Sequence, residues 1–100
     1  MRDDTLEDLR IVHLSPGRVR LRSHRLRSMP ALGTKIQERL AAIPGVERVE
    51  LNALTGSVLL VYDRKRLASE GALARLGKVL DELFPTLDRA SVFDWLKRTA

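Results

Sequence analysis

The side chains best suited to chemistry in this 100-residue chain are arginines gathered in one short stretch. The segment GRVRLRSHRLR, residues 17–27, contains five arginines and one histidine. Together with a net charge of +5, they favour acidic partners, namely nucleic acid, an anionic membrane surface or an acidic protein. The first three arginines alternate with Val19 and Leu21, which is the period of a strand with one buried face. The same pattern is typical of a solvated strand face whose arginine stems cover apolar neighbours, so both interpretations stay open.

Other kinds of chemistry have less support. The chain has no cysteine, which excludes disulfides, zinc–thiolate sites and thiol redox chemistry. The remaining soft or borderline metal ligands are His13, His24, Met1 and Met29, and the two histidines are not at a pairing distance in the sequence. No nucleophile is grouped with a base, and no glycine-rich phosphate loop occurs. We therefore expect no enzyme activity, no metal site and no cofactor.

The composition limits the class of protein. A hydrophobic content of 44% and a charged content of 31% are typical of one small globular domain. No apolar run is long enough to cross a bilayer, and the first ten residues carry four acids without an apolar segment. These observations predict a cytoplasmic protein.

Hydrophobic periodicity predicts the elements that position the arginines. Strands are expected near residues 10–22, 46–53 and 56–63, and helices near 29–43, capped by Ser28, and 67–84. Because Pro16-Gly17 favours a type II turn, whose twist does not suit a tight hairpin, we expect one long bulged strand over 10–22. Ser91 is expected to cap a short, two-turn C-terminal helix. The organisation is then an acidic tail at 1–9, a domain at 10–84 and an extension at 85–100.

A strand-helix-strand-strand-helix order is the ferredoxin-like split arrangement without its last strand. The segment from Arg39 to Asp63, with PGV after the first helix and LTGSVLLVYD on the third strand, resembles the heavy-metal-associated domain family of metal chaperones and metal-transporting P-type ATPases. The resemblance implies an α+β fold, with an antiparallel sheet and two helices on one of its faces.

The same resemblance bears on function. The two metal-binding cysteines of the family would fall near Ser28 and Ala31, and neither residue supplies a thiolate. The chain is similar to the cysteine-free branch related to N-terminal domains of metal-transporting P-type ATPases, whose first strand is similar to residues 16–22. This implies a noncatalytic module without a metal site that contacts proteins, such as a metal-transporting ATPase, in metal transport or homeostasis.

The predicted interaction surface has two parts, the uncovered sheet face and the C-terminal helix. It comprises Arg18, Arg20, Arg22, Arg25, Arg27, Leu59, Val61, Phe93 and Trp95. The alternative function is a basic domain that binds nucleic acid or an anionic surface through the five arginines. None of the four aromatic residues falls on the uncovered sheet face, which disfavours recognition of bases by stacking.

Two further expectations concern packing and assembly. Packing of Phe93 and Trp95 against the domain is favoured over docking of a partner. Because Pro85 makes a fourth strand doubtful, the first strand would be an unpaired edge. We therefore expect a homodimer through this edge or the adjacent face, with the Phe93–Trp95 helix across the seam. The alternative is a monomer in which residues 86–89 form the fourth strand.

Overall fold

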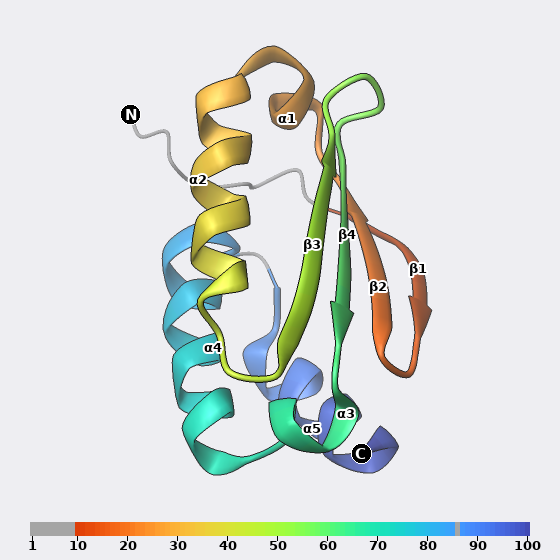
Figure 1. Cartoon of the computed structure of the whole chain (residues 1–100), viewed down its shortest axis with the longest axis vertical. Helices are drawn as coiled ribbons and strands as arrows, with labels where there is room; N and C mark the ends of the chain where they lie inside the picture. Colours follow the sequence, from red (N-terminus) through yellow and green to blue (C-terminus); the bar gives the residue numbers. More distant parts are fainter. Residues whose placement is uncertain (1–9, 86) are drawn as a thin grey trace.

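Alternating apolar residues form a four-stranded antiparallel sheet in the computed structural model, which describes residues 10–85 and 87–100. The strands are β1 (Arg10–Ser15), β2 (Arg18–Arg22), β3 (Val46–Asn52) and β4 (Ser57–Tyr62), in the spatial order β1-β2-β4-β3 (Figure 1). Strand β4 is buried on both faces, as its continuous apolar sequence predicts for a central strand. The expected α+β class with a split strand order is confirmed.

The prediction of one long strand over residues 10–22 is wrong, because β1 and β2 form a hairpin. Gly17 occupies the turn with φ = 87°, the backbone conformation that a type II turn requires after Pro16. The register of the hairpin shifts between Ile11 and His13, which marks a bulge in β1 at the end away from the turn. Pairing also satisfies the backbone groups along the outer side of β2.

The hairpin supplies the fourth strand that the sequence pattern left in doubt. Strand β1 lies beside β2 and runs antiparallel to it, so β1 becomes the edge of the sheet in place of β2. The alternative strand at residues 86–89 does not form: Arg89 already begins a helix, Leu87 and Asp88 lie in neither a strand nor a helix, and Thr86 is outside the described residues. The predicted tail at residues 1–9 is also outside them.

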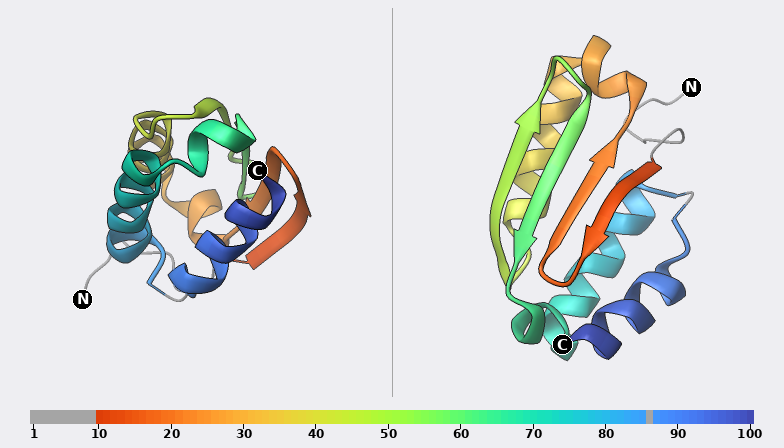
Figure 2. Two further views of the ribbon diagram at one scale, coloured as in Figure 1. Left: turned by 90° about the horizontal axis from the view of Figure 1, so that it is seen from below. Right: turned by 90° about the vertical axis from the view of Figure 1, so that its right-hand side faces the viewer.

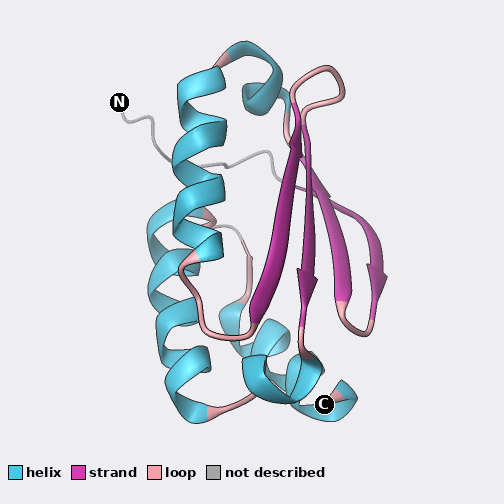
Figure 3. Cartoon of the chain, viewed as in Figure 1, coloured by secondary structure: helices cyan, strands magenta, loops and turns pink. Residues whose placement is uncertain are grey.

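The helices cover one face of the sheet (Figures 2 and 3). They are α1 (His24–Ser28), α2 (Pro30–Ala41), α3 (Arg64–Leu67), α4 (Glu70–Leu83) and α5 (Arg89–Thr99). The expected helix at 29–43 therefore corresponds to α2, and the one at 67–84 corresponds to α4, while α1 and α3 are short additional helices. Pro30 begins α2, where its missing N–H costs nothing. None of the described helices is long and apolar enough to cross a membrane.

Helix caps differ from those expected. Ser28 does not cap α2: Ser23 caps α1, its hydroxyl accepting from the Arg25 amide at 3.2 Å, and Met29 occupies the N-cap of α2 without a side-chain bond. The chain leaves β2 at Ser23, one turn earlier than the periodicity predicts. The Ser23 hydroxyl therefore caps the helix that follows the strand.

Helix α5 begins earlier and is longer than predicted. Its N-cap is Asp88, which accepts hydrogen bonds from the Ala90 amide at 3.1 Å and the Ser91 hydroxyl at 2.8 Å. An ion pair of 2.6 Å joins Arg89 to Asp81 and holds the start of α5 against α4. Gly77 leaves room for the Arg89 guanidinium, which would collide with any side chain there.

The core lies between the sheet and the helices. Leu26 of α1, Ile36 and Leu40 of α2 and Leu83 of α4 are almost completely buried. From the sheet, side chains on the predicted inner face join them, namely Val19, Leu21, Val49, Leu51, Val58, Leu60 and Tyr62. None of the described helices lies over the opposite face of the sheet (Figure 2), and this face carries the predicted arginine row.

Candidate functional site

The uncovered face of the sheet, here called the open face, brings together three arginines of β2 and two apolar residues of β4. Arg18 pairs with Val61 and Arg20 pairs with Leu59, while Arg22 pairs with Ser57. Directly paired residues project to the same face of a sheet, so the arginines flank the apolar side chains. Leu59 is only 8% exposed although no helix covers it. The flexible arginine stems therefore shield an apolar floor and leave their charges in water.

Neighbouring strands add further charge to the open face. Arg10 pairs with Arg22 and His13 pairs with Arg20, so β1 extends the basic row. On β3, Arg48 forms an ion pair of 2.8 Å with Glu50, the carboxylate of that strand which points to this face. Arg18, Arg20 and Arg22 form no ion pair within residues 10–85 and 87–100. Within that part of the chain, no carboxylate neutralises their charge.

Two shallow hollows lie on either side of Leu59. One, of about 290 Å³, lies toward β3 and the 53–56 turn, and its lining includes Arg20, Arg22, Glu50 and Asn52. The other, of about 370 Å³, lies toward β1 and includes Val12, His13 and Arg18. Polar side chains form much of both linings. The open face is thus a basic, uneven surface that suits acidic side chains or phosphates.

Arg25 and Arg27 do not extend this arginine row along a strand, because the chain turns into α1 at His24. Arg25 contacts the Met29 sulfur at 3.7 Å, and the Arg27 stem packs at the turn that contains Gly56. The five arginines of the predicted interaction surface are therefore divided between β2, which ends at Arg22 as predicted, and α1, which holds Arg25 and Arg27. A change from period two to a helical spacing after Ser23 is the signal that could have revealed it.

Phe93 and Trp95 lie on α5, on the covered side of the sheet. Both are half-buried and pack against the core, and the Arg89 guanidinium lies 5.5 Å from the Phe93 ring centroid. The two parts of the predicted interaction surface, the uncovered sheet face and the C-terminal helix, consequently lie on opposite sides of the sheet. The preferred expectation, packing of these aromatics against the domain, agrees with this arrangement.

The described residues contain no group of three or more histidine, cysteine, aspartate or glutamate side chains that could hold a metal ion. Ser28 ends α1 and Ala31 lies in the first turn of α2, and neither has a donor that a soft metal ion prefers. His13 and His24 belong to different elements.

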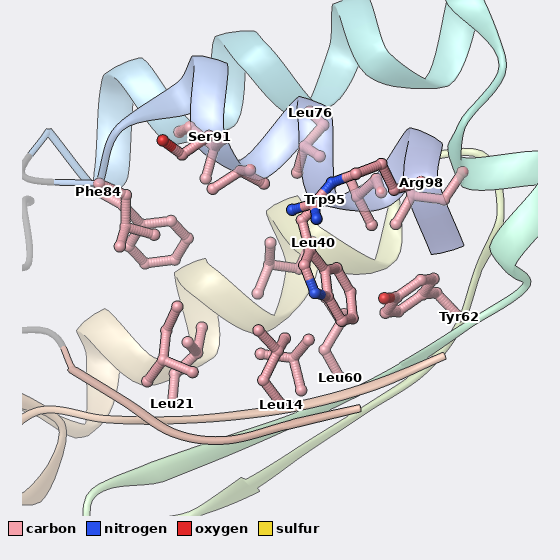
Figure 4. A pocket seen from close by; sticks show the side chains of 17 residues that line it. Leu14, Leu21, Leu40, Leu60, Tyr62, Leu76, Phe84, Ser91, Trp95 and Arg98 are labelled. Atoms are coloured by element: carbon pink, nitrogen blue, oxygen red, sulfur yellow. The ribbon is translucent and has the colours of Figure 1, made fainter. Parts of the chain in front are cut away.

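Sequence reasoning missed an apolar chamber on the covered side of the sheet (Figure 4). Its volume is about 340 Å³, and it lies between β1, β2, β4, α4 and α5. The Tyr62 hydroxyl is buried there and has no hydrogen-bond partner within the described part of the chain. Burial raises the pKa of Tyr62, and the nearby Gly17 amide and Arg64 guanidinium only partly offset this effect. The sequence signal was an inward-facing tyrosine at the end of a strand with no evident polar neighbour.

Comparison with known proteins gives one match. A family model described as heavy metal associated domain 2 matches residues 3–83, which is well over half of the chain. No curated protein and no solved structure matches.

Proposed function

The chain belongs to the heavy metal associated domain 2 family, and from this membership we propose a noncatalytic, cytoplasmic interaction module of metal transport or metal homeostasis. It binds an acidic surface of a protein partner, such as a metal-transporting ATPase, on the open face of its sheet. Membership supports the metal-related role, and the chemistry of the open face supports the mode of contact.

The observation that carries the proposal is the alignment of Arg18, Arg20 and Arg22 on one uncovered face. Their guanidinium groups have no carboxylate partner within the described residues, and their stems cover Leu59. A partner with acidic side chains gains charge-assisted hydrogen bonds there, and displacement of the stems exposes an apolar floor for contact. Such charge complementarity contributes to specificity and association rate.

The proposed role does not require this chain to hold the metal ion. Cysteine thiolates are absent from the whole sequence, and thiolates are the ligands that select Cu(I) and bind Zn(II) tightly. Calorimetric titration with Cu(I) or Zn(II) under reducing conditions is expected to show no stoichiometric heat. Binding at micromolar affinity or tighter would contradict this part of the proposal.

The same three arginines support one competing function, binding of nucleic acid or another polyanion. The open face has no aromatic side chain for base stacking, since Tyr62, Phe84, Phe93 and Trp95 all belong to the covered side. Binding of this kind would be electrostatic and strongly salt-dependent. Filter binding to DNA and RNA at two salt concentrations measures it directly.

A photo-crosslinking residue placed at position 20 tests the partner. The matched control is position 78 on α4, where Lys78 is exposed on the helix side. We expect position 20, and not position 78, to capture a protein of metal transport in cells. In a second experiment the crosslinker is moved to position 59, between the arginines. Substitution of Arg18, Arg20 and Arg22 by glutamine should then abolish capture of the partner protein.

The control triple variant replaces Arg75, Lys78 and Lys97 by glutamine, with the same change in charge, and should retain capture. Equal capture by positions 20 and 78 would contradict a docking role of the open face. Salt-sensitive retention on nucleic acid that disappears with the three β2 arginines, without protein capture, would establish the competing function.

We also propose that the chain forms a homodimer through the free edge of β1. Among the described residues, no strand pairs with the outer side of β1. Ile11, Val12 and Leu14 are 43–44% exposed, an unusual accumulation of apolar surface on an edge strand. Pairing with β1 of a second copy would continue the sheet and bury part of this surface, because an isologous contact repeats the same strand.

A further inference from the structure

The apolar chamber on the covered side of the sheet has the construction of a ligand site. Its volume of about 340 Å³ falls in the range that small-molecule pockets occupy, roughly 300–1,000 Å³. The walls come from distant parts of the chain: Leu14 and Leu21 from the hairpin, Leu76 from α4 and Trp95 from α5. Figure 4 shows these side chains pointing into one space.

The opening of the chamber lies along the seam between β1 and α5. Ile11 and Leu14 line the chamber and are 44% and 43% exposed, so solvent reaches these walls from the β1 edge. Val92 and Trp95 face them from α5 and are half-buried. An apolar molecule can therefore enter without disrupting α2, α4 or the central strands.

One end of the chamber is polar. Tyr62 is 4% exposed and its hydroxyl has no hydrogen-bond partner within the described residues. Figure 4 shows this hydroxyl directed into the chamber, at the same end as Arg98 and away from Phe84. Arg98 also lines the chamber; its side chain is 66% exposed, and an ion pair of 3.1 Å joins its Nε to Asp94, one turn earlier in α5.

Water is a poor occupant for this site. A buried water molecule needs two to four polar partners, and beyond the end that holds Tyr62 and Arg98 the lining is almost entirely apolar, so water cannot fill the chamber. An empty chamber would leave the wall side chains without dispersion contacts on one side and the hydroxyl without an acceptor. A molecule that restores both needs a hydrocarbon body and an acceptor at one end.

We propose that this chamber binds an apolar monocarboxylate, with its hydrocarbon body among the leucines and its carboxylate accepting hydrogen bonds from the Tyr62 hydroxyl and the Arg98 guanidinium. The carboxylate is favoured over a neutral acceptor because Arg98 is the cation of the lining, and its terminal nitrogens have no partner in the described residues. This site lies on the side of the sheet opposite the open face, so it is independent of the proposed protein contact.

Decanoate below its micelle concentration is the probe, with decanol and decylammonium as matched controls for charge. Trp95 is the single tryptophan of the chain and lines the chamber, so its fluorescence reports occupancy. We expect saturable binding of one decanoate per chain, with weaker binding of decanol and the weakest of decylammonium.

Three substitutions connect binding with the chamber. Val92→Phe adds volume to the wall and should weaken decanoate binding about tenfold by displacing buried methylenes. Arg98→Gln should remove the preference for decanoate over decanol, and Tyr62→Phe should weaken decanoate binding. Arg75→Gln, an exposed arginine on α4 outside the lining, is the control and should bind like the unsubstituted chain.

If Val92→Phe fails to fold, a second measurement still tests the proposal. Methyl NMR of the unsubstituted chain should show decanoate-dependent shifts for Leu14, Leu21 and Leu76 but not for Leu54, whose side chain is 87% exposed. Absence of saturable fluorescence change, binding of decylammonium equal to that of decanoate, or shifts spread over the surface would overturn the proposal. None of these outcomes affects the crosslinking test of the open face.

Discussion

At the residue scale, the Tyr62 hydroxyl is buried and has no hydrogen-bond partner among the described residues. Buried polar groups in proteins seldom lack a partner. A buried polar group without a partner costs about 1–3 kcal/mol. We therefore predict that Tyr62→Phe raises the free energy of unfolding by about 1 kcal/mol or more in the absence of ligand. Urea denaturation near pH 7 measures the change, and a loss of stability would show that the hydroxyl has a stabilising partner.

The raised pKa of Tyr62 also predicts a dependence on pH. Because burial raises the pKa in the folded state, the unfolded chain releases this proton first, at about pH 10. The folded state therefore keeps its full stability below that pH, where the phenol is neutral in both states, and the free energy of unfolding falls as pH rises from there through the folded-state pKa. The difference in stability between the native chain and Tyr62→Phe should thus change above about pH 10. Phenolate absorbance follows the ionisation directly, because Tyr62 is the single tyrosine; a midpoint at or below the ordinary value would contradict the prediction.

Gly45 in the PGV segment has a backbone that other residues rarely adopt. Its φ is 94°, and a Cβ there would lie 2.7 Å from the Leu67 amide nitrogen at the end of α3. Gly45→Ala should cost at least about 2 kcal/mol, because strain and backbone collision act together. Gly71→Ala is the matched control: it lies in α4 with nothing within 4 Å of the added methyl, and should stabilise by about 0.5–1 kcal/mol. Equal effects of the two substitutions in thermal unfolding would contradict this account.

At the scale of elements, α5 depends on its N-cap and on its contact with α4. The pKa of Asp88 is lowered, first by the Ser91 hydroxyl and then by the Ala90 amide, so the carboxylate stabilises the folded state above its ordinary pKa. That contribution is lost as pH falls through the lower, folded-state pKa. We predict that Asp88→Ala lowers the thermal midpoint at neutral pH and removes this acid-dependent part of stability.

Asp88→Asn separates the two properties of the cap, because asparagine accepts the Ala90 hydrogen bond but does not titrate. It should retain most of the neutral-pH stability and lack the acid dependence. Amide hydrogen exchange over residues 89–99 localises the effect to α5. Faster exchange in β4, with no change in α5, would show that Asp88 acts on another element.

At the scale of the whole molecule, the free β1 edge predicts an equilibrium between chains. Sedimentation equilibrium at tens of micromolar should give a mass above the 11.3 kDa of one chain. Val12→Lys adds a charge to the edge and should shift the equilibrium toward the single chain, as lysines do on natural edge strands. Leu54→Lys, a comparable change at an exposed turn, should leave the mass unchanged. A mass of one chain for the native protein would exclude the dimer.

Local pattern was sufficient to predict much of this molecule. The alternation of Val19 and Leu21 with arginines assigned each side chain of β2 to its face, because successive residues of a strand project to opposite sides. The spacing of Leu73, Leu76 and Leu80 likewise defined the buried side of α4. The α+β class, the open face at Arg18–Arg22 and the family resemblance all depend on such short-range order, and the sequence alone was enough for them.

Long-range packing settled the rest. The turn at Pro16-Gly17 is compatible with either a bulge or a hairpin, and pairing of β1 with β2 selects the hairpin. Strand β1 occupies the edge position that a fourth strand would take. The C-terminal segment instead forms α5, which closes one side of the chamber that contains Tyr62. Local propensity carries no information about which distant segment fills an edge or how much space two elements leave between them, because both depend on the free energy of contacts across the whole fold.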